Sequence, residues 1–118
     1  MYIITKQFHF SASHQLYNLP DGHACSKLHG HNYIVEVELQ SEELDERGFV
    51  IDYGELKPLA DYINNALDHR HLNEVLDFQT SAENIAKHLY DFCKSIWIET
   101  TSIRVSETPK TWAEYRRT

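Results

Sequence analysis

The sequence predicts an α+β fold, in which an antiparallel four-stranded sheet carries two helices on one face. Alternating stretches near the N-terminus are typical of strands with one buried face, apolar residues at helical spacing follow in the middle, and another strand pattern comes near the end. Because strands and helices are segregated along the chain, the sheet is expected to be antiparallel. A chain of 118 residues is long enough for one compact domain, residues 1–118, and too short for two ordinary ones.

The first strand is predicted over residues 2–14, where apolar side chains largely share one parity. Proline, aspartate and glycine then mark a loop over residues 18–26. A second strand is predicted over residues 31–40. The acidic stretch 42–48 should turn the chain into a short third strand, 49–51, which would be the hairpin neighbour of the second. The apolar positions of the first strand are Tyr2, Ile4, Phe8, Phe10 and Ala12.

Two helices are predicted next, each behind a possible capping box, in which a short polar residue accepts from backbone N–H groups of the first turn. Asp52 with Glu55 opens the first, and Thr80 with Glu83 opens the second. Pro58 removes one backbone hydrogen bond, so the first helix is expected to start late or to have a distorted first turn. The apolar positions are Leu56, Leu59, Ala60, Ile63, Ala66 and Leu67 in the first helix and Ile85, Ala86, Leu89, Phe92 and Cys93 in the second.

The last long strand is predicted over residues 101–108, with residues 112–115 as a candidate short terminal strand. Its apolar face carries Ile103, Val105 and Glu107. An unpaired carboxylate is costly to bury, so Glu107 is expected either to pair with a protein cation or to receive the N–H donors of a ligand. The adjacent N–H groups of a guanidine-like ring edge would suit a bidentate carboxylate.

The charge of the chain excludes some classes of partner. With 11 basic and 18 acidic residues the net charge is −7, which disfavours nucleic acid and anionic membranes. No apolar run approaches the length of a membrane span, and the first residues do not resemble a secretion leader, so a cytoplasmic location is expected. The two cysteines should stay reduced there, with Cys93 packed inside the second helix.

Three histidines form the strongest chemical signal. His29 and His31 are two residues apart in a strand, so they project to one face, and Gly30 between them takes up no room. His14 continues the apolar parity of the first strand. Three neutral imidazoles with no evident fourth ligand predict a zinc site with one open position, as in catalytic rather than structural zinc sites.

Two further groups are candidates for proton transfer. Cys25 lies in a polar stretch before the histidine pair, and its thiol would act as a base or nucleophile only as the thiolate. A zinc ligand or an idle thiol are the alternatives for this residue. Asp68 precedes His69 after the first helix, and a carboxylate beside an imidazole suits a proton relay, although a histidine also commonly ends a helix.

Nearly the whole chain resembles the 6-pyruvoyl-tetrahydropterin synthase family, and within it the bacterial branch that makes 6-carboxy-5,6,7,8-tetrahydropterin for queuosine biosynthesis. The most specific element is a cysteine separated by three residues from a following His-Gly-His, with a histidine upstream. The matching motifs are Phe10-x-Ala12-x-His14, Cys25-Ser26-Lys27-Leu28-His29-Gly30-His31-Asn32-Tyr33, Ile51-Asp52-Tyr53-x-x-Leu56-Lys57, Leu67-Asp68-His69-x-x-Leu72-Asn73, Thr80-x-x-Glu83-Asn84 and Val105-x-Glu107-Thr108.

The resemblance implies a role for each candidate residue. His14, His29 and His31 would hold zinc, and Glu107 would anchor the pterin or join the relay. It also implies the tunnelling fold, in which subunits pool their sheets into a barrel, usually a hexamer of two trimers with sites at subunit interfaces. The remaining implied catalytic residues are Cys25 as proton acceptor and Asp68 and His69 as its relay.

The implied reaction is that of a lyase, which converts 7,8-dihydroneopterin triphosphate to 6-carboxy-5,6,7,8-tetrahydropterin, acetaldehyde and triphosphate. The spacing does not select a cation for the triphosphate among Lys27, Arg70 and Arg104. Three alternatives stay open. They are a 6-pyruvoyl-tetrahydropterin synthase with the same site, a non-enzymatic module in which Cys25 is the fourth zinc ligand, and a zinc hydrolase.

Overall fold

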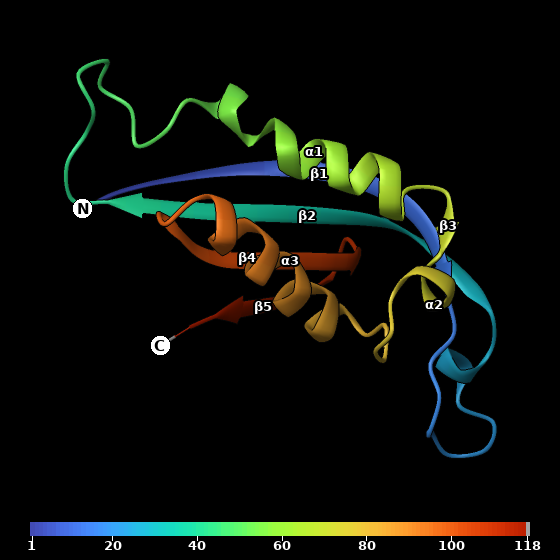
Figure 1. Cartoon of the computed structure of the whole chain (residues 1–118). Helices are drawn as coiled ribbons and strands as arrows, with labels where there is room; N and C mark the ends of the chain where they lie inside the picture. Colours follow the sequence, from blue (N-terminus) through green and yellow to red (C-terminus); the bar gives the residue numbers. More distant parts are fainter. Residues whose placement is uncertain (118) are drawn as a thin grey trace.

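A mixed five-stranded sheet forms the body of the computed structural model, which describes residues 1–117 (Figure 1). Its strand order is β3-β1-β2-β4-β5, in which β3 runs parallel to β1 and all other neighbours are antiparallel. The predicted α+β class is confirmed, but the predicted four-stranded antiparallel sheet is wrong. The strands are β1 (Tyr2–His14), β2 (His29–Ser41), β3 (Arg70–His71), β4 (Thr100–Thr108) and β5 (Thr111–Arg116).

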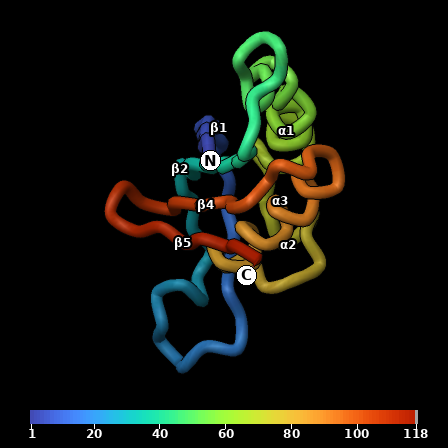
Figure 2. Tube along the Cα trace, turned by 90° about the vertical axis from the view of Figure 1, so that its left-hand side faces the viewer, coloured from blue at the N-terminus to red at the C-terminus, as the bar shows by residue number. Residues whose placement is uncertain are grey.

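The helices cover one face of this sheet, so the molecule has two layers (Figure 2). The apolar face of the long helix α3 packs against β4 and β5, while α1 lies along β1 (Figure 1). The prediction of two helices on one face is therefore confirmed, with short helical turns added between them. The helical elements are η1 (Ala24–Ser26), η2 (Tyr53–Leu56), α1 (Lys57–Tyr62), η3 (Ile63–Leu67), α2 (Leu72–Val75) and α3 (Ala82–Ile96).

The core lies between the two layers and follows the alternation in the sequence. On β2, Tyr33, Val35, Val37 and Leu39 have no exposed surface. The opposite face of the sheet is polar and carries ion pairs, such as Glu36–Arg104 at 3.1 Å and Glu38–Arg116 at 2.8 Å. Period-two alternation therefore placed each strand's apolar side chains toward the helices.

The predicted strand over residues 49–51 does not form, so its hairpin with the second strand is also wrong. The Asp45 carboxylate accepts from the backbone N–H groups of Arg47 and Phe49, and the Asp45 N–H donates to the Phe49 carbonyl. Gly48 completes this turn at φ +87°. Because the loop closes on itself, its backbone groups are not free for a ladder, and β2 pairs with β4 instead.

The start of the first helix agrees with the expected effect of its proline. Asp52 caps a 3-10 turn by accepting from the Gly54 N–H at 2.8 Å. The α-helix itself begins only at Lys57, with Pro58 in its first turn, where a missing N–H costs little. Both the late start and the altered first turn are thus confirmed.

The second capping prediction is wrong by one residue. The Ser81 hydroxyl, and not that of Thr80, caps α3 by accepting from the Asn84 N–H at 3.3 Å. Thr80 is fully buried, and its hydroxyl lies 3.2 Å from Nδ1 of His14 in β1. A residue expected to begin a helix therefore belongs to the candidate site.

The packing of α3 supports a prediction on stability. Leu89→Ala should lower the free energy of unfolding by about 2–5 kcal/mol, because Leu89 is fully buried and truncation leaves a cavity. Ile98→Ala is the control, since Ile98 is 78% exposed. Urea denaturation at a fixed protein concentration measures both. Equal losses in the two variants would contradict this assignment of the core.

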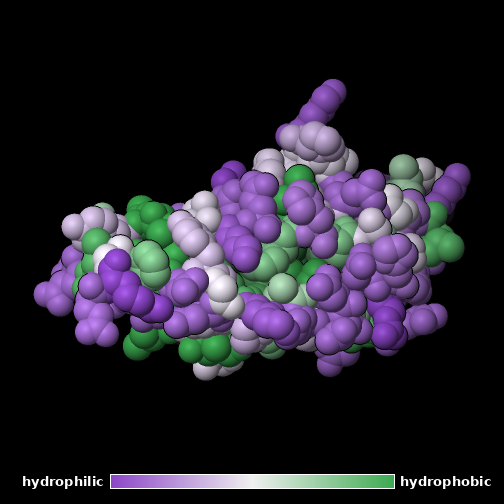
Figure 3. Space-filling view, turned by 90° about the horizontal axis from the view of Figure 1, so that it is seen from above, coloured by the Kyte–Doolittle hydropathy of each residue, from purple (hydrophilic) through white to green (hydrophobic). Residues whose placement is uncertain are grey.

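At the end of the molecule where the chain begins, exposed hydrophobic side chains lie among hydrophilic ones (Figure 3). A hollow of about 230 Å³ there is lined in part by Ile3, Leu44 and Phe49. The candidate functional residues lie toward the other end of β1. Among residues 1–117, no helix is both long and apolar enough to cross a membrane.

Candidate metal centre and active site

The three predicted histidines meet at one end of the sheet. His14 pairs with His29 across β1 and β2, and His31 follows on the same face. One nitrogen from each ring lies within 4.8 Å of the others, and the ring centroids are 4.6–5.2 Å apart. A Cβ atom at Gly30 would lie 3.3 Å from the Ala12 carbonyl oxygen, so a larger residue there would press on β1.

Backbone carbonyls orient two of the rings. The Nδ1 atom of His14 lies 2.7 Å from the Thr80 carbonyl oxygen, and that of His29 lies 2.7 Å from the Lys27 carbonyl oxygen. Because a carbonyl oxygen only accepts, each Nδ1 carries the proton and each Nε2 keeps a lone pair. Burial lowers the pKa of His14 to about 4, so its ring is neutral at physiological pH.

Glu107 faces the rings of His14 and His31. Its Oε2 atom lies 3.4 Å from His14 Nε2 and 3.8 Å from His31 Nε2. His14 Nε2 is buried and has no hydrogen-bond partner among residues 1–117, so the 3.4 Å contact joins two acceptors. Burial, and then the charge of Glu83, raise the pKa of Glu107.

Two acceptors held together in a partly buried place repel each other unless a cation or donor lies between them. A group of three imidazole nitrogens beside a carboxylate has the donor chemistry that binds zinc and similar transition metals. The residues therefore fit a metal ion, and the group His14, His29 and His31 could hold one.

Cys25 lies close in sequence to this group without joining it. It sits in η1, where the His23 ring accepts from the Cys25 N–H, and its carbonyl oxygen accepts from the Leu16 N–H at 2.9 Å. The thiol is partly exposed and free. Among residues 1–117, the candidate metal group contains three imidazoles and no sulfur.

Asp68 and His69 form the contact that their adjacency suggested. His69 Nδ1 lies 3.0 Å from Asp68 Oδ2, while Asp68 Oδ1 accepts from the Ser11 N–H at 2.9 Å. The hydrogen bond from Ser11, and then that from His69, lower the pKa of Asp68. His69 has φ +58°, a strained conformation for a residue other than glycine, and its side chain is 82% exposed.

One chain does not bring the thiol and this pair together. The His69 N–H donates to the Ser11 carbonyl, whereas the Cys25 carbonyl accepts a hydrogen bond from the Leu16 N–H. Ser11 and Leu16, the residues that hold His69 and Cys25, lie five positions apart in the sequence. This separation corresponds to roughly 16 Å at the rise of an extended strand. The predicted relay therefore needs a second copy of the chain or a large movement.

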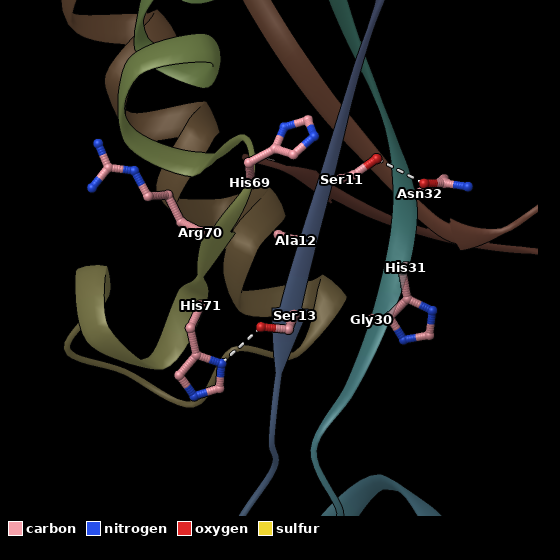
Figure 4. A pocket seen from close by; sticks show the side chains of 9 residues that line it. All are labelled: Ser11, Ala12, Ser13, Gly30, His31, Asn32, His69, Arg70 and His71. Atoms are coloured by element: carbon pink, nitrogen blue, oxygen red, sulfur yellow. Dashed lines mark hydrogen bonds between the residues drawn. The ribbon is translucent and has the colours of Figure 1, made fainter.

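An open groove of about 500 Å³ lies beside His69 (Figure 4). Arg70 and His71 line one side, Gly30 and His31 the other, and the Ser13 hydroxyl lies 3.0 Å from His71 Nδ1. Arg104, another candidate for the triphosphate, is instead paired with Glu36 and stacked on Trp112.

Sequence reasoning missed two residues of this centre. Thr80 was assigned to a helix cap, but its carbonyl holds His14. Tyr33 was named only as the last residue of the motif that contains His29 and His31, and its ring lies edge-on to His31 and His14, with centroids 5.5 and 6.0 Å apart. Only the parity that Tyr33 shares with His31 hinted at this position.

Comparisons with known proteins agree with the motifs. The family described as 6-pyruvoyl tetrahydropterin synthase (PTPS) matches residues 3–118. A relative named 6-carboxy-5,6,7,8-tetrahydropterin synthase from Synechocystis is 34% identical over 122 residues, covering 98% of this chain and 93% of its own. One of the same name from Bacillus subtilis is 32% identical over 127 residues, covering 96% and 84%.

The fold matches solved structures of the same kind. The structure of Caenorhabditis elegans 6-pyruvoyl tetrahydropterin synthase superposes with a TM-score of 0.84 at 28% identity, covering 100% of this chain and 98% of that one. The subunit fold implied by the resemblance is thereby confirmed. With the motifs, the family match and the fold in agreement, the chain belongs to the 6-pyruvoyl tetrahydropterin synthase family of pterin synthases.

Proposed function

We propose that this chain converts 7,8-dihydroneopterin triphosphate and one water molecule to 6-carboxy-5,6,7,8-tetrahydropterin, acetaldehyde and triphosphate, in queuosine biosynthesis. The names of the bacterial relatives support this branch of the family. The observation that carries the chemistry is the buried Nε2 lone pair of His14, which faces the Glu107 carboxylate at 3.4 Å. This arrangement calls for a cation.

In the proposed site, His14, His29 and His31 hold a zinc ion. The orientation of two rings by backbone carbonyls supports this, because such contacts fix the tautomer that ligates through Nε2. When bound, zinc supplies a Lewis acid that acidifies hydroxyls and polarises carbonyls of the substrate side chain. Since zinc has no redox chemistry, reduction of the ring must be balanced by oxidation of the substrate's own side chain.

The protein's own groups bind the ring and move protons. Glu107 binds the guanidine-like edge of the pterin, where two adjacent N–H groups match a carboxylate. Cys25, as the thiolate, accepts a proton from the side chain, and His69, held by Asp68, passes protons between side chain and ring. The contact of 3.0 Å between His69 and Asp68 supports this relay.

The relay is completed by a second copy of the chain. The roughly 16 Å between the attachment points of Cys25 and His69 supports a site shared between subunits. We propose a homo-oligomer, a hexamer of two trimers, in which the sheets close a barrel. Arg70, which lines the groove beside His69, is then the best placed of the three candidate cations to receive triphosphate.

Incubation with 7,8-dihydroneopterin triphosphate alone tests the proposed reaction. We expect 6-carboxytetrahydropterin, acetaldehyde and triphosphate in equal amounts, identified by mass spectrometry and an aldehyde assay. A product that keeps the side-chain carbons would instead identify a 6-pyruvoyl-tetrahydropterin synthase, the second candidate, which the name of the C. elegans structure favours. An unchanged pterin would overturn both.

A further inference from the structure

Tyr33 lies beside the histidine group but has no role in the site described above. Its side chain has no exposed surface. The ring stacks on Phe10 of β1, with centroids 4.6 Å apart and an angle of 3° between the planes, and it lies edge-on to His31 and His14. Neighbouring rings on β1 and β2 therefore hold the tyrosine in one orientation.

The hydroxyl of Tyr33 is an unpaired buried donor. It has no hydrogen-bond partner among residues 1–117, and together with His14 Nε2 it makes up the buried unpaired side-chain atoms of this part of the chain. Leaving such a group unpaired costs about 1–3 kcal/mol, so natural proteins rarely do it without a functional reason. Phenylalanine would fill nearly the same volume without this cost.

The sheet register brings an acceptor opposite this donor. Ile34 of β2 pairs with Ser106 of β4, so the next position of the antiparallel register sets Tyr33 opposite Glu107. Side chains directly opposite in such a pair have Cβ atoms about 4.5–5.5 Å apart. Glu107 has a second oxygen besides the one that faces His14, and the terminal torsion of a glutamate turns easily.

We propose that Tyr33 is a positioning residue, whose hydroxyl donates a hydrogen bond to the Glu107 carboxylate when the histidine group holds its ion. The bond pairs the buried donor and fixes the plane of the carboxylate. A carboxylate offers about four lone-pair directions, so one bond from Tyr33 leaves room for two N–H groups of a ligand. In this respect the inference rests on the proposed function, in which Glu107 binds the pterin.

A double-mutant cycle tests the contact without any pterin. Wild type, Tyr33→Phe, Glu107→Ala and the double variant are each loaded with zinc, and metal content and thermal midpoint are measured. Tyr33→Phe should lower the midpoint by about 3–6 °C when Glu107 is present, because a hydrogen bond to a charged group is lost. In the Glu107→Ala background, Tyr33→Phe should not lower the midpoint, because the hydroxyl has no acceptor there. Within each background, Tyr33→Phe should leave the zinc content unchanged.

Tyr90→Phe is the matched control. Tyr90 is a buried tyrosine of α3 that packs against Tyr115 and not against the histidine group, so its effect should be the same in both backgrounds. A midpoint that drops equally with and without Glu107, or does not drop in either, overturns the proposed contact.

Binding of neopterin, followed by its fluorescence, then connects the contact to the proposed function. Tyr33→Phe should weaken binding about tenfold in the wild-type background and leave it unchanged in the Glu107→Ala background. An equal loss in both backgrounds would mean that the hydroxyl contacts the ligand itself, which overturns the positioning role. If wild type binds no neopterin, the proposed function fails. The double-mutant cycle measured by thermal midpoints still shows whether Tyr33 contacts Glu107.

Discussion

Replacement of His14 by alanine is expected to remove the bound metal and to lower turnover by roughly a thousandfold, since a metal ion contributes several kcal/mol to the transition state. His14 is the most buried of the three imidazoles, and its ring is held by Thr80. Without it, only two nitrogens remain beside the Glu107 carboxylate. Mass spectrometry of the metal content tests the loss of metal. The kcat measured with 7,8-dihydroneopterin triphosphate tests the loss of turnover separately.

His9→Ala is the control for this variant. His9 lies on the same strand but is exposed on the other face of the sheet, so its loss should change neither metal content nor kcat. A His14→Ala protein that keeps both its metal and its turnover would show that the ion is bound elsewhere or has no role.

Cobalt substitution distinguishes the open site from a closed structural one. If Cys25 were a fourth ligand, the cobalt protein would show a thiolate charge-transfer band. The all-nitrogen site proposed here predicts its absence. Cys25 lies in η1, outside the group of three nitrogens, and this position agrees with the absence of a thiolate charge-transfer band.

Cys25→Ala and His69→Ala should each lower kcat by about 10²- to 10⁴-fold, the usual contribution of a general acid or base, with the metal retained. Mixing the two inactive proteins under conditions that exchange subunits should then restore activity. If each site takes its thiol from one copy and its imidazole from another, random mixing makes about a quarter of the sites complete. The recovered kcat should approach that fraction of the wild-type value.

The reason for this expectation is the distance of roughly 16 Å between Leu16 and Ser11, the residues to which Cys25 and His69 are hydrogen-bonded. The double variant Cys25→Ala/His69→Ala, mixed with wild type, provides the reference for subunit exchange. If the mixture of single variants stays inactive while exchange is demonstrated, both groups serve a site within one chain, and the proposed shared site is wrong.

Local patterns predicted much of this molecule. The long strands β1, β2 and β4, the helix α3 and the faces they bury follow from alternation and helical spacing, because these periods depend only on neighbouring residues. The prediction for residues 49–51 was wrong because hydrogen bonds of the Asp45 turn outweighed three apolar residues with strand propensity. The parallel strand β3 has two residues, too few for a pattern to appear.

The sequence by itself determined that His14, His29 and His31 share a face, since parity decides the side of a sheet on which a residue lies. The tertiary structure decided what those residues face. Register between strands far apart in the chain sets Tyr33 opposite Glu107, and packing of the segment before α3 brings the Thr80 carbonyl to His14. Such contacts depend on how distant segments pack, and no periodic pattern in the local sequence predicts that packing.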